Sequence, residues 1–557
     1  MSTPNARPLS QDMVDNPPEN VAIVEKPPEN GKIGIVHLGL GNFARAHWAS
    51  IIDDMPADQK GDWGISGVSM RSARIRDQLE PQDNLYTLTE RRPEGDKTRI
   101  ISAVKETLVG PEDPQRLIAR IAHPDTKVVS MTITQGGYKR DDDDNLDPQA
   151  YAIDKDYLVD GEAPRVADEI AGTTPPVSMP AVLTEALKQR KEAGLPPITV
   201  ACLDNIPDNG AVTKKVLQQF AEAKYGKELA DYIGYNIVFP NSMVDRITPA
   251  ASAEDAQSLV DKHGISDASP VFTEPYRQLI IEDNFAEGTK PPIGDVQGVK
   301  LTEDVRPFEA AKIRMLNGAH MMMGALGRVA GFKTVDEVMA DPDMGAFTKR
   351  FLSEVAATID PIPGTDMQVY ADDLVERFDN PQLKDSVDRL ANDTSKKLKP
   401  RLMDAIHASI HKGTPNQALG VALAGWQRFI GGVSQNTPTP ESSDKPTGVT
   451  DTGRVYVISD PRAKELQDLA REEGPNVNRV HEAMGFGLSM YGKNGQDLRR
   501  RVQSSLETML KGDAMSAIRA VTMRLDELPK PVVPKDDGAS GGPKPPGPED
   551  RSGPKLS

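Results

Sequence analysis

Residues 32–44 read Lys-Ile-Gly-Ile-Val-His-Leu-Gly-Leu-Gly-Asn-Phe-Ala. The first seven form a short apolar run typical of a buried strand, and residues 45–55 continue with helical spacing. Gly39 permits a tight turn, Gly41 lets the backbone approach a pyrophosphate, and the small Ala44 allows the strand and helix to pack closely. The pattern predicts a dinucleotide-binding strand, turn and helix; the alternative is a turn that merely tolerates glycine.

Further strand-like and helical segments extend this unit into two domains. Apolar runs resembling the first strand are found at residues 63–70, 128–134 and 198–203. Helical spacers separate these runs, which indicates a parallel sheet with crossover helices. After about residue 305 the pattern becomes mainly helical, as at residues 417–433, 465–473 and 498–525. We expect an α/β fold with a Rossmann-type nucleotide-binding domain (31–300), a mainly α-helical C-terminal domain (301–528) and disordered tails (1–30 and 529–557).

Composition argues against several classes of function. The chain has 83 acidic and 66 basic residues and a formal charge of -17, so it should repel nucleic acid and anionic lipid. No apolar stretch approaches the roughly 20 residues that span a bilayer, and the N-terminus does not resemble a secretion signal. The single cysteine, Cys202, excludes an internal disulfide and a cysteine-built zinc site. We expect a cytoplasmic protein, monomeric or a small homo-oligomer, that acts on a small molecule.

The preference for NAD or NADP is ambiguous in the sequence. The second predicted strand ends in Met-Arg-Ser-Ala-Arg (70–74) and lacks the acidic residue that usually holds a ribose 2'-hydroxyl. Arg71 is able to accept a 2'-phosphate, which would favour NADP. The alternative is that Arg71 is a solvated loop residue.

A second group of chemically capable residues lies on a predicted helix at residues 308–320. At roughly 100° per residue, Glu309, Lys312, Asn317 and His320 fall within an arc of about 140°. A buried lysine with a lowered pKa can take a proton from an alcohol, and amide and imidazole groups can hold the developing oxygen charge. The alternative is a solvated helix face with an incidental histidine.

Six ordered segments resemble the polyol-specific long-chain dehydrogenases, whose members act on mannitol or on hexuronates. These segments are residues 39–47, 130–138, 204–210, 239–250, 274–285 and 312–320. The resemblance implies an N-terminal nucleotide-binding domain, a helical C-terminal domain, substrate between them, NAD as cofactor (NADP remaining possible) and no metal. It also implies cofactor contacts from the residues of the first strand and turn. These are Ile35, Gly39, Leu40, Gly41, Asn42, Phe43 and Ala44, with Arg71 added from the second strand.

The resemblance also implies roles for individual residues. Lys312 is similar to the general base, Asn205 and Asn317 to the oxyanion donors, and His320 to the residue that orients substrate hydroxyls. Substrate contacts are implied for Asp245, Arg389 and Lys397, and a proton path for Glu309. The expected reaction is the NAD-dependent interconversion of D-mannitol and D-fructose. Reduction of fructuronate or tagaturonate is the alternative within the same chemistry, and an NAD-binding regulator is the non-enzymatic alternative.

Several residues depart from the family pattern, and other motifs are weaker candidates. Ala44 stands where histidine is usual, Gln135 where glutamate is usual, and Lys399 where proline is common. These changes affect the choice of substrate more than the type of reaction. The pair Tyr151 and Lys155 has the spacing of a short-chain dehydrogenase site, and His407 and His411 that of zinc ligands. We interpret the first pair as loop residues, the second as surface residues, and Cys202 as a core residue.

Overall fold

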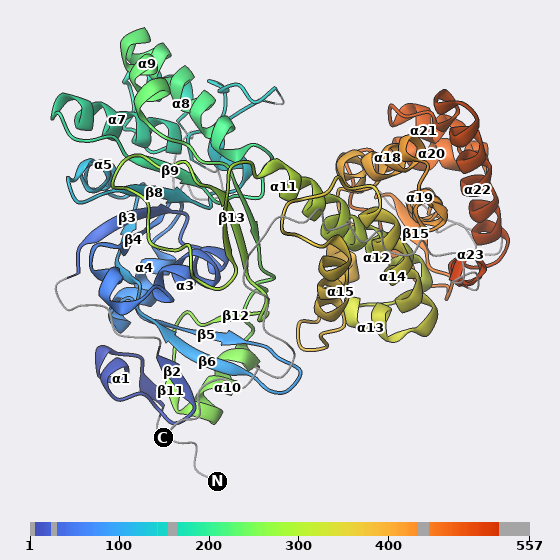
Figure 1. Cartoon of the computed structure of the whole chain (residues 1–557), viewed down its shortest axis with the longest axis horizontal. Coiled ribbons are helices and arrows are strands. Elements are labelled where there is room, and N and C mark those ends of the chain that lie inside the picture. The colour runs from blue at the N-terminus through green and yellow to red at the C-terminus, as the bar shows by residue number, and fades with distance from the viewer. Residues whose placement is uncertain (1–5, 24–30, 142, 154–163, 433–444, 523–557) are drawn as a thin grey trace, which may run out of the picture.

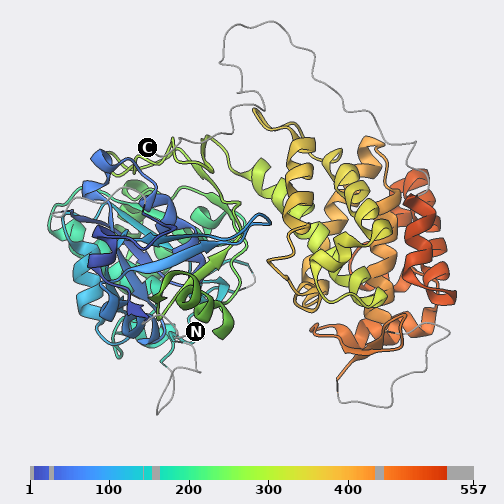
Figure 2. The ribbon, with the colours of Figure 1, turned by 90° about the horizontal axis from the view of Figure 1, so that it is seen from below.

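The computed structural model describes residues 6–23, 31–141, 143–153, 164–432 and 445–522. They form two bodies joined at helix α11, as Figures 1 and 2 show. The first body contains strands and helices, and the second is almost entirely helical. The change falls between β14 (Val299–Thr302) and α11 (Arg306–Lys312).

A five-stranded parallel sheet organises the first body. Its order is β7-β4-β3-β8-β9, so the third, second, first, fourth and fifth of these strands along the chain lie side by side. The bounds are β3 Ile33–Leu38, β4 Gly64–Ser69, β7 Val104–Val109, β8 Val128–Met131 and β9 Thr199–Cys202. The order reverses between β3 and β8, where ligands bind at the carboxyl ends of such strands. The predicted parallel sheet is confirmed.

Helices and smaller sheets cover both faces of this sheet. One face packs against α5 (Pro114–Ala122), α7 (Met179–Glu192) and α8 (Asn209–Tyr225). The other face packs against α3 (Trp48–Asp53), and against the sheet β10-β13-β14, in which β10 spans Ser242–Asp245 and β13 spans Gln278–Glu282. A third sheet has the order β12-β5-β6-β2, with bounds Val271–Thr273, Tyr86–Glu90, Lys97–Ile101 and Val21–Ile23. The remaining helices of this body are α2 (Asn42–Ala46), α4 (Arg74–Leu79), α6 (Val166–Ala171), α9 (Lys227–Asn236) and α10 (Ala253–His263).

The expectation of a disordered tail over residues 1–30 is wrong for residues 6–23. Strand β1 (Arg7–Pro8) pairs with β11 (Ile265–Ser266), helix α1 spans Gln11–Asp15, and β2 joins the third sheet. The reason is a small apolar cluster in which Leu9 and Met13 are buried. Proline and asparagine dominate the composition there and conceal these few apolar residues. Residues 1–5, 24–30 and the predicted tail 529–557 lie outside the described residues.

The second body is a helical bundle around α19 (Gln417–Gly431), which is buried along its whole length and packs against α12 and α22. Its other elements are α12 Gly318–Ala330, α13 Val335–Ala340, α14 Pro342–Ala356, α15 Met367–Phe378, α16 Val387–Leu390, α17 Thr394–Leu398, α18 Asp404–Lys412, α20 Ala463–Glu473, α21 Asn478–Ala483, α22 Gly492–Lys511, α23 Ala514–Thr522 and the hairpin β15 Thr447–Val449 with β16 Val455–Val457. The helical run predicted at residues 498–525 is broken between α22 and α23. No helix in the described part of the chain is both long and apolar enough to cross a membrane.

The helix that carries Lys312 is not a uniform α-helix. Between α11 and α12 the residues Ile313–Asn317 form a π-helical turn, η5. A π turn changes the rotation between the residues before it and those after it, so the arc calculated from uniform α-helical spacing is wrong. A second π turn, η6 (Lys399–Met403), packs against the first. Gly318 permits this contact, because a Cβ atom there would lie 2.6 Å from the carbonyl oxygen of Arg401.

Candidate active site

The glycine turn after β3 is held against the neighbouring strands. The amides of Gly39 and Leu40 both donate to the carbonyl of Val68, at 2.8 and 3.1 Å. Gly39 has a φ of 93°, and a Cβ atom there would lie 2.2 Å from the carbonyl oxygen of Thr132, so only glycine fits. A cavity of about 310 Å³ opens over the turn between β3, β4 and the segment after β8.

The turn has the shape required to bind a dinucleotide. A Cβ atom at Gly41 would meet nothing closer than 4.0 Å, so the missing side chain leaves open space beside the cavity. Asn42, Phe43 and Ala44 line an adjacent cavity of about 820 Å³ that continues toward Lys312. These features fit a pyrophosphate and nicotinamide laid across the turn. Ile35 does not belong to this site, because it lies in the middle of β3 with its side chain fully buried in the core.

Lys312 lies at the end of α11 and reaches across to the first body. Its Nζ donates to Asn205 Oδ1 at 3.0 Å and to the carbonyl of Val244 at the end of β10. Burial lowers the pKa of Lys312, although the nearby carboxylate of Asp245 opposes this shift. Lys312 therefore has the lowered proton affinity that a base acting on an alcohol needs.

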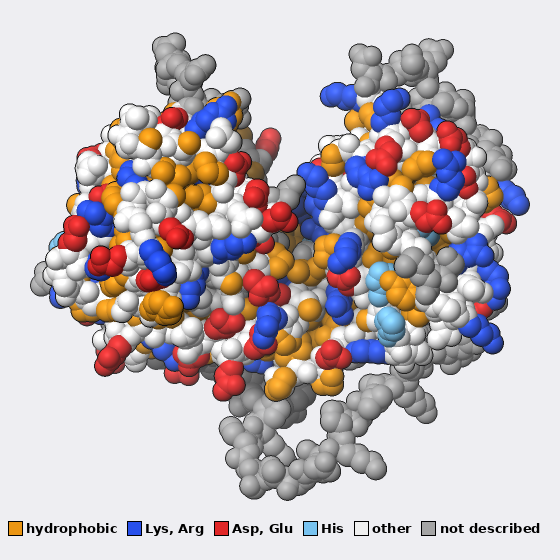
Figure 3. All heavy atoms as spheres, turned by 90° about the horizontal axis from the view of Figure 1, so that it is seen from above, with side chains coloured by type: hydrophobic (Ala, Val, Ile, Leu, Met, Phe, Trp, Pro, Cys, Tyr) orange, Lys and Arg blue, Asp and Glu red, His pale blue; other side chains and the backbone are white. Residues whose placement is uncertain are grey.

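The two asparagines lie beside Lys312, where two cavities meet. Two cavities are lined by Asn205, Asn317 and Lys312. The larger cavity, of about 820 Å³, begins at Gly41 of the glycine turn, and the smaller cavity has about 500 Å³. Because Asn205 Oδ1 accepts from Lys312, its amide nitrogen faces away and is able to donate to a substrate oxygen. The structure thus brings together residues that are far apart in the sequence. Figure 3 shows a hollow between the two bodies, and residues of both bodies line the two cavities.

His320 faces the larger cavity as a neutral imidazole. Burial lowers its pKa to about 4. Its ring packs against Phe378 with 5.0 Å between the ring centres, and its Nε2 is buried with no hydrogen-bond partner among the described residues. Because His320 lines the cavity, an imidazole nitrogen that lacks a partner is suited to bind a ligand hydroxyl there.

Asp245 lines the same cavity but is already engaged by a residue that sequence reasoning missed. Arg377, on α15 of the helical body, donates to both oxygens of Asp245 at 2.7 and 3.1 Å. It also donates to both oxygens of Glu274 at 2.9 and 2.8 Å, and its guanidinium lies 4.0 Å from the centre of the Tyr276 ring. All three charged side chains are at most 6% exposed. The Arg377–Asp245–Glu274 triad therefore joins the two bodies behind the site.

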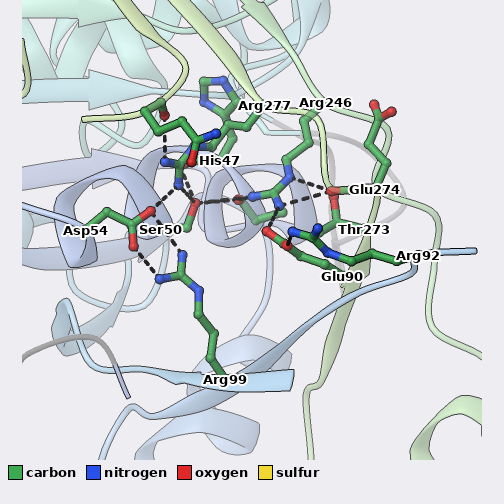
Figure 4. A network of polar contacts seen from close by, with 12 residues as sticks. His47, Ser50, Asp54, Glu90, Arg92, Arg99, Arg246, Thr273, Glu274 and Arg277 are labelled. Carbon is green, nitrogen blue, oxygen red and sulfur yellow. Dashed lines mark hydrogen bonds and ion pairs between the residues drawn. The ribbon is translucent and has the colours of Figure 1, made fainter. Parts of the chain in front are cut away.

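Arg246 and His47, which belong to the segments that resemble the family, take part in a network of hydrogen bonds and ion pairs near the site. Arg246 donates to Glu90 at 2.8 Å and to the carbonyl of Glu274 at 3.0 Å, and His47 donates through Nε2 to the carbonyl of Gln278 at 2.8 Å. Figure 4 shows these groups continuing to Arg277, which contacts Asp54. His47 thus holds β13 in place, and Arg246, which also lines the larger cavity, ties the end of β10 to Glu90 and Glu274.

Asp204 fixes the segment that carries Asn205. Its carboxylate accepts from the amides of Ile133 and Thr134, each at 2.9 Å, and from the hydroxyl of Tyr138 at 2.7 Å. The same hydroxyl lies 2.6 Å from the sulfur of Cys202, and burial raises the pKa of this thiol to about 12. Cys202 is thus a core residue, as expected, and is not a nucleophile.

Three further predicted residues lie around the two cavities. Glu309 lines the smaller cavity beside Lys312; burial and the charge of Asp208 raise its pKa to about 7. Lys397 lines that same cavity and donates to the carbonyl of Asn392 at 2.8 Å. Arg389 instead lines the larger cavity and forms an ion pair with Asp385. Lys397 and Arg389 were both predicted to contact substrate, and the structure places them in different cavities.

The weaker motifs form no second site among the residues that the structure describes. Both His407 and His411 pack against the ring of Tyr491. Among the described residues, no group of three or more histidine, cysteine or acidic side chains is placed to hold a metal ion. Tyr151 forms an isolated bridge with Arg165 outside any helix, and Lys155 lies outside the described residues.

Comparison with known proteins gives matches along most of the chain. A model of the mannitol dehydrogenase Rossmann domain matches residues 33–294, and one of the mannitol dehydrogenase C-terminal domain matches residues 304–510. Mannitol 2-dehydrogenase of Pyrenophora tritici-repentis is 36% identical over 503 residues, which are 89% of this chain and 82% of that protein. The protein of the same name from Pyricularia oryzae is 35% identical over 500 residues, 87% of this chain and 92% of that protein.

Two solved structures share the fold. The ternary complex of Pseudomonas fluorescens mannitol 2-dehydrogenase with NAD and D-mannitol superposes with a TM-score of 0.72 at 30% identity, covering 93% of this chain and all (100%) of that one. A substrate-free D-sorbitol dehydrogenase superposes with a TM-score of 0.76 at 27% identity, covering 92% of this chain and 100% of that one.

Proposed function

Because the chain belongs to the mannitol dehydrogenase family, we propose that it interconverts a sugar alcohol and its ketose, with D-mannitol and D-fructose as the first pair to test. The relative solved with NAD and D-mannitol supports both the cofactor class and the substrate. The observation that carries the proposal is the buried Lys312, which contacts Asn205 beside the cavity that begins at the glycine turn.

In this mechanism Lys312 exchanges the proton of the reacting hydroxyl. During oxidation the neutral amine takes that proton, and during reduction the ammonium returns it to the forming alcohol. The nicotinamide, when bound, accepts or donates the hydride. The burial that lowers the pKa of Lys312 makes the neutral amine accessible at lower pH than for an exposed lysine. Because side chains supply the proton acceptor and the oxygen donors, the proposal requires no metal ion.

The remaining residues hold substrate oxygens and conduct the proton. The amides of Asn205 and Asn317 donate to the oxygen at which negative charge develops. The free Nε2 of His320 binds a neighbouring hydroxyl, while Arg389 and Lys397 are proposed to contact distal parts of the substrate. Glu309, with a pKa of about 7, passes the proton between Lys312 and the solvent of the smaller cavity.

A Lys312→Ala variant tests the base. We expect turnover to fall by about 10²- to 10⁴-fold, with NADH binding, followed by fluorescence, near that of the wild type. Lys349→Ala, which changes an exposed lysine of α14, is the matched control. Retention of wild-type turnover by Lys312→Ala would rule out the assignment. Full cofactor binding without turnover on any polyol or ketose would favour a regulatory protein on the same fold.

One observation favours the acidic alternative, reduction of fructuronate or tagaturonate. Arg401 lines the smaller cavity and makes no hydrogen bond or ion pair with another described residue, so its guanidinium is available to a terminal carboxylate. A panel of mannitol, fructose, fructuronate and tagaturonate distinguishes the two substrate classes. A higher kcat/KM for an acid than for fructose would replace the mannitol proposal.

A further inference from the structure

The loop that follows β4 is fixed beside the glycine turn. Because the carbonyl of Val68, near the end of β4, accepts from both Gly39 and Leu40, the two loops share one edge of the sheet. The amide of Ser72 donates to the hydroxyl of Ser69 at 3.3 Å, which closes the second loop on itself. In a Rossmann fold this loop faces the ribose of the adenosine half of the cofactor.

The polar side chains that this loop gives to the cavity are cationic or hydroxylic. Ser69, Arg71, Ser72 and Arg74 line it beside the apolar Met70, and Lys139 lines it from the segment after β8. No carboxylate of a described residue lines this cavity. An NAD-specific site of this fold usually places a carboxylate here, where it accepts from the 2'-hydroxyl, whereas a site for NADP places arginine.

Arg74 differs from the next arginine of the same helix in its contacts. Arg76 forms ion pairs with Asp77 at 2.8 Å and with Glu112, and it does not line the cavity. Arg74 is exposed, lines the cavity and has no hydrogen bond or ion pair with another described residue. Its positive charge is close enough to Arg45 to lower the pKa of that buried guanidinium, although burial has the larger effect. Asp77, the acidic residue closest to Arg74 along the chain, is thus paired with Arg76.

We propose that Arg71 and Arg74, with the hydroxyl of Ser72, form a subsite for the 2'-phosphate of NADP(H). The phosphate dianion would gain charge-assisted hydrogen bonds from two guanidinium groups. The ribose 2'-hydroxyl of NAD(H) would find no carboxylate acceptor among the described residues of this loop. The enzyme therefore uses NADP(H) at least as efficiently as NAD(H). This inference rests on the proposed function only in that the same cavity must bind a dinucleotide.

Binding of cofactor fragments tests the subsite without any turnover. Isothermal titration of the full chain with 2',5'-ADP and with 5'-AMP compares ligands that differ by the 2'-phosphate. We expect 2',5'-ADP to bind at least about tenfold more tightly. The double variant Arg71→Ala/Arg74→Ala should lose most of this difference, whereas Arg76→Ala should keep it. Because the phosphate contact is ionic, the difference should also shrink as salt rises.

A charge reversal gives a second, independent measurement. Arg74→Glu should lower the ratio of kcat/KM for NADPH to that for NADH by more than about tenfold, since the carboxylate repels the phosphate. Equal binding of the two fragments to the wild type, or an unchanged ratio in Arg74→Glu, would overturn the subsite while leaving the proposed oxidoreductase intact. Failure of both fragments to bind would overturn the dinucleotide site and the inference together.

Discussion

Replacement of Arg377 by methionine should show how much the Arg377–Asp245–Glu274 triad contributes to the free energy of unfolding. The substitution keeps a long side chain but removes four hydrogen bonds, of 2.7 to 3.1 Å, to Asp245 and Glu274. Both carboxylates would stay where they are now, 6% and 1% exposed, without the guanidinium that pairs with them, and Asp245 would keep only the nearby charge of Lys312. Leaving a buried charge unpaired in this way costs about 3 to 5 kcal/mol.

This loss should depend on pH in a defined direction. In the wild type, burial raises the pKa of Asp245, but Arg377 and Lys312 together keep it below its ordinary value, while burial keeps that of Glu274 above. Without Arg377, burial raises the pKa of both carboxyls, so the folded variant takes up protons more readily than the unfolded chain. The variant should therefore lose less stability relative to the wild type at pH 5 than at pH 7.

Urea unfolding at these two pH values is the assay, with the free energy of unfolding as the measured quantity. Arg306→Met is the matched control, because its ion pair with Asp304 is exposed and such pairs contribute little to stability. The triple variant Arg377→Met/Asp245→Asn/Glu274→Gln should recover part of the loss, since no charge remains buried. A loss below about 1 kcal/mol at pH 7, or one that grows toward pH 5, would refute this reasoning.

Three further perturbations follow from the site. Glu309 has a pKa of about 7 in the fold against an ordinary 4.5, so the wild type should lose on the order of 2 kcal/mol as pH rises between these values. Glu309→Gln should not show this loss. Urea titrations of both proteins at pH 5 and pH 8 give the free energies of unfolding, and an equal change in the two proteins would contradict the prediction. Burial lowers the pKa of Lys312 below 10.5, so oxidative kcat/KM should rise with pH to a plateau with an apparent pKa below that value, while reduction declines; a profile without any inflection below 10.5 would contradict a lysine base. Gly41→Val fills the open space beside the cavity and should raise the Kd for NADH more than about tenfold without changing the urea midpoint. An unchanged Kd in an NADH fluorescence titration would contradict the binding of the cofactor across the glycine turn.

Local patterns predicted the parts of the site that local geometry determines. The strand, glycine turn and helix at residues 32–55 depend on neighbouring residues, and so does the helical placement of Lys312 and His320. The triad could not be found in this way, because Arg377 lies 132 residues from Asp245 and nothing in the spacing links them. A signal existed only in the chemistry: an acid in a recognised segment needs a cation if it is buried.

The folded N-terminal segment and the π turn could not be predicted from the sequence, for two different physical reasons. The folded N-terminal segment depends on Leu9 and Met13 finding a pocket formed by distant residues, which composition cannot express. The π turn packs against the second π turn, at a contact that Gly318 permits, so its surroundings come from residues distant in the sequence. Sequence periodicity assumes one rotation per residue and cannot detect a local change of that rotation.

The π turn also means that one helix carries the site in two rotational phases. Glu309 and Lys312 precede the turn and Asn317 closes it, while His320 follows in the phase of α12. If the same five residues, 313–317, relaxed to regular α geometry, which winds by roughly 100° per residue, everything after them would turn about the helix axis by most of one residue's rotation. The base would keep its place while the imidazole rotated out of the cavity. The two functions are thus joined by a segment whose winding sets their relative direction.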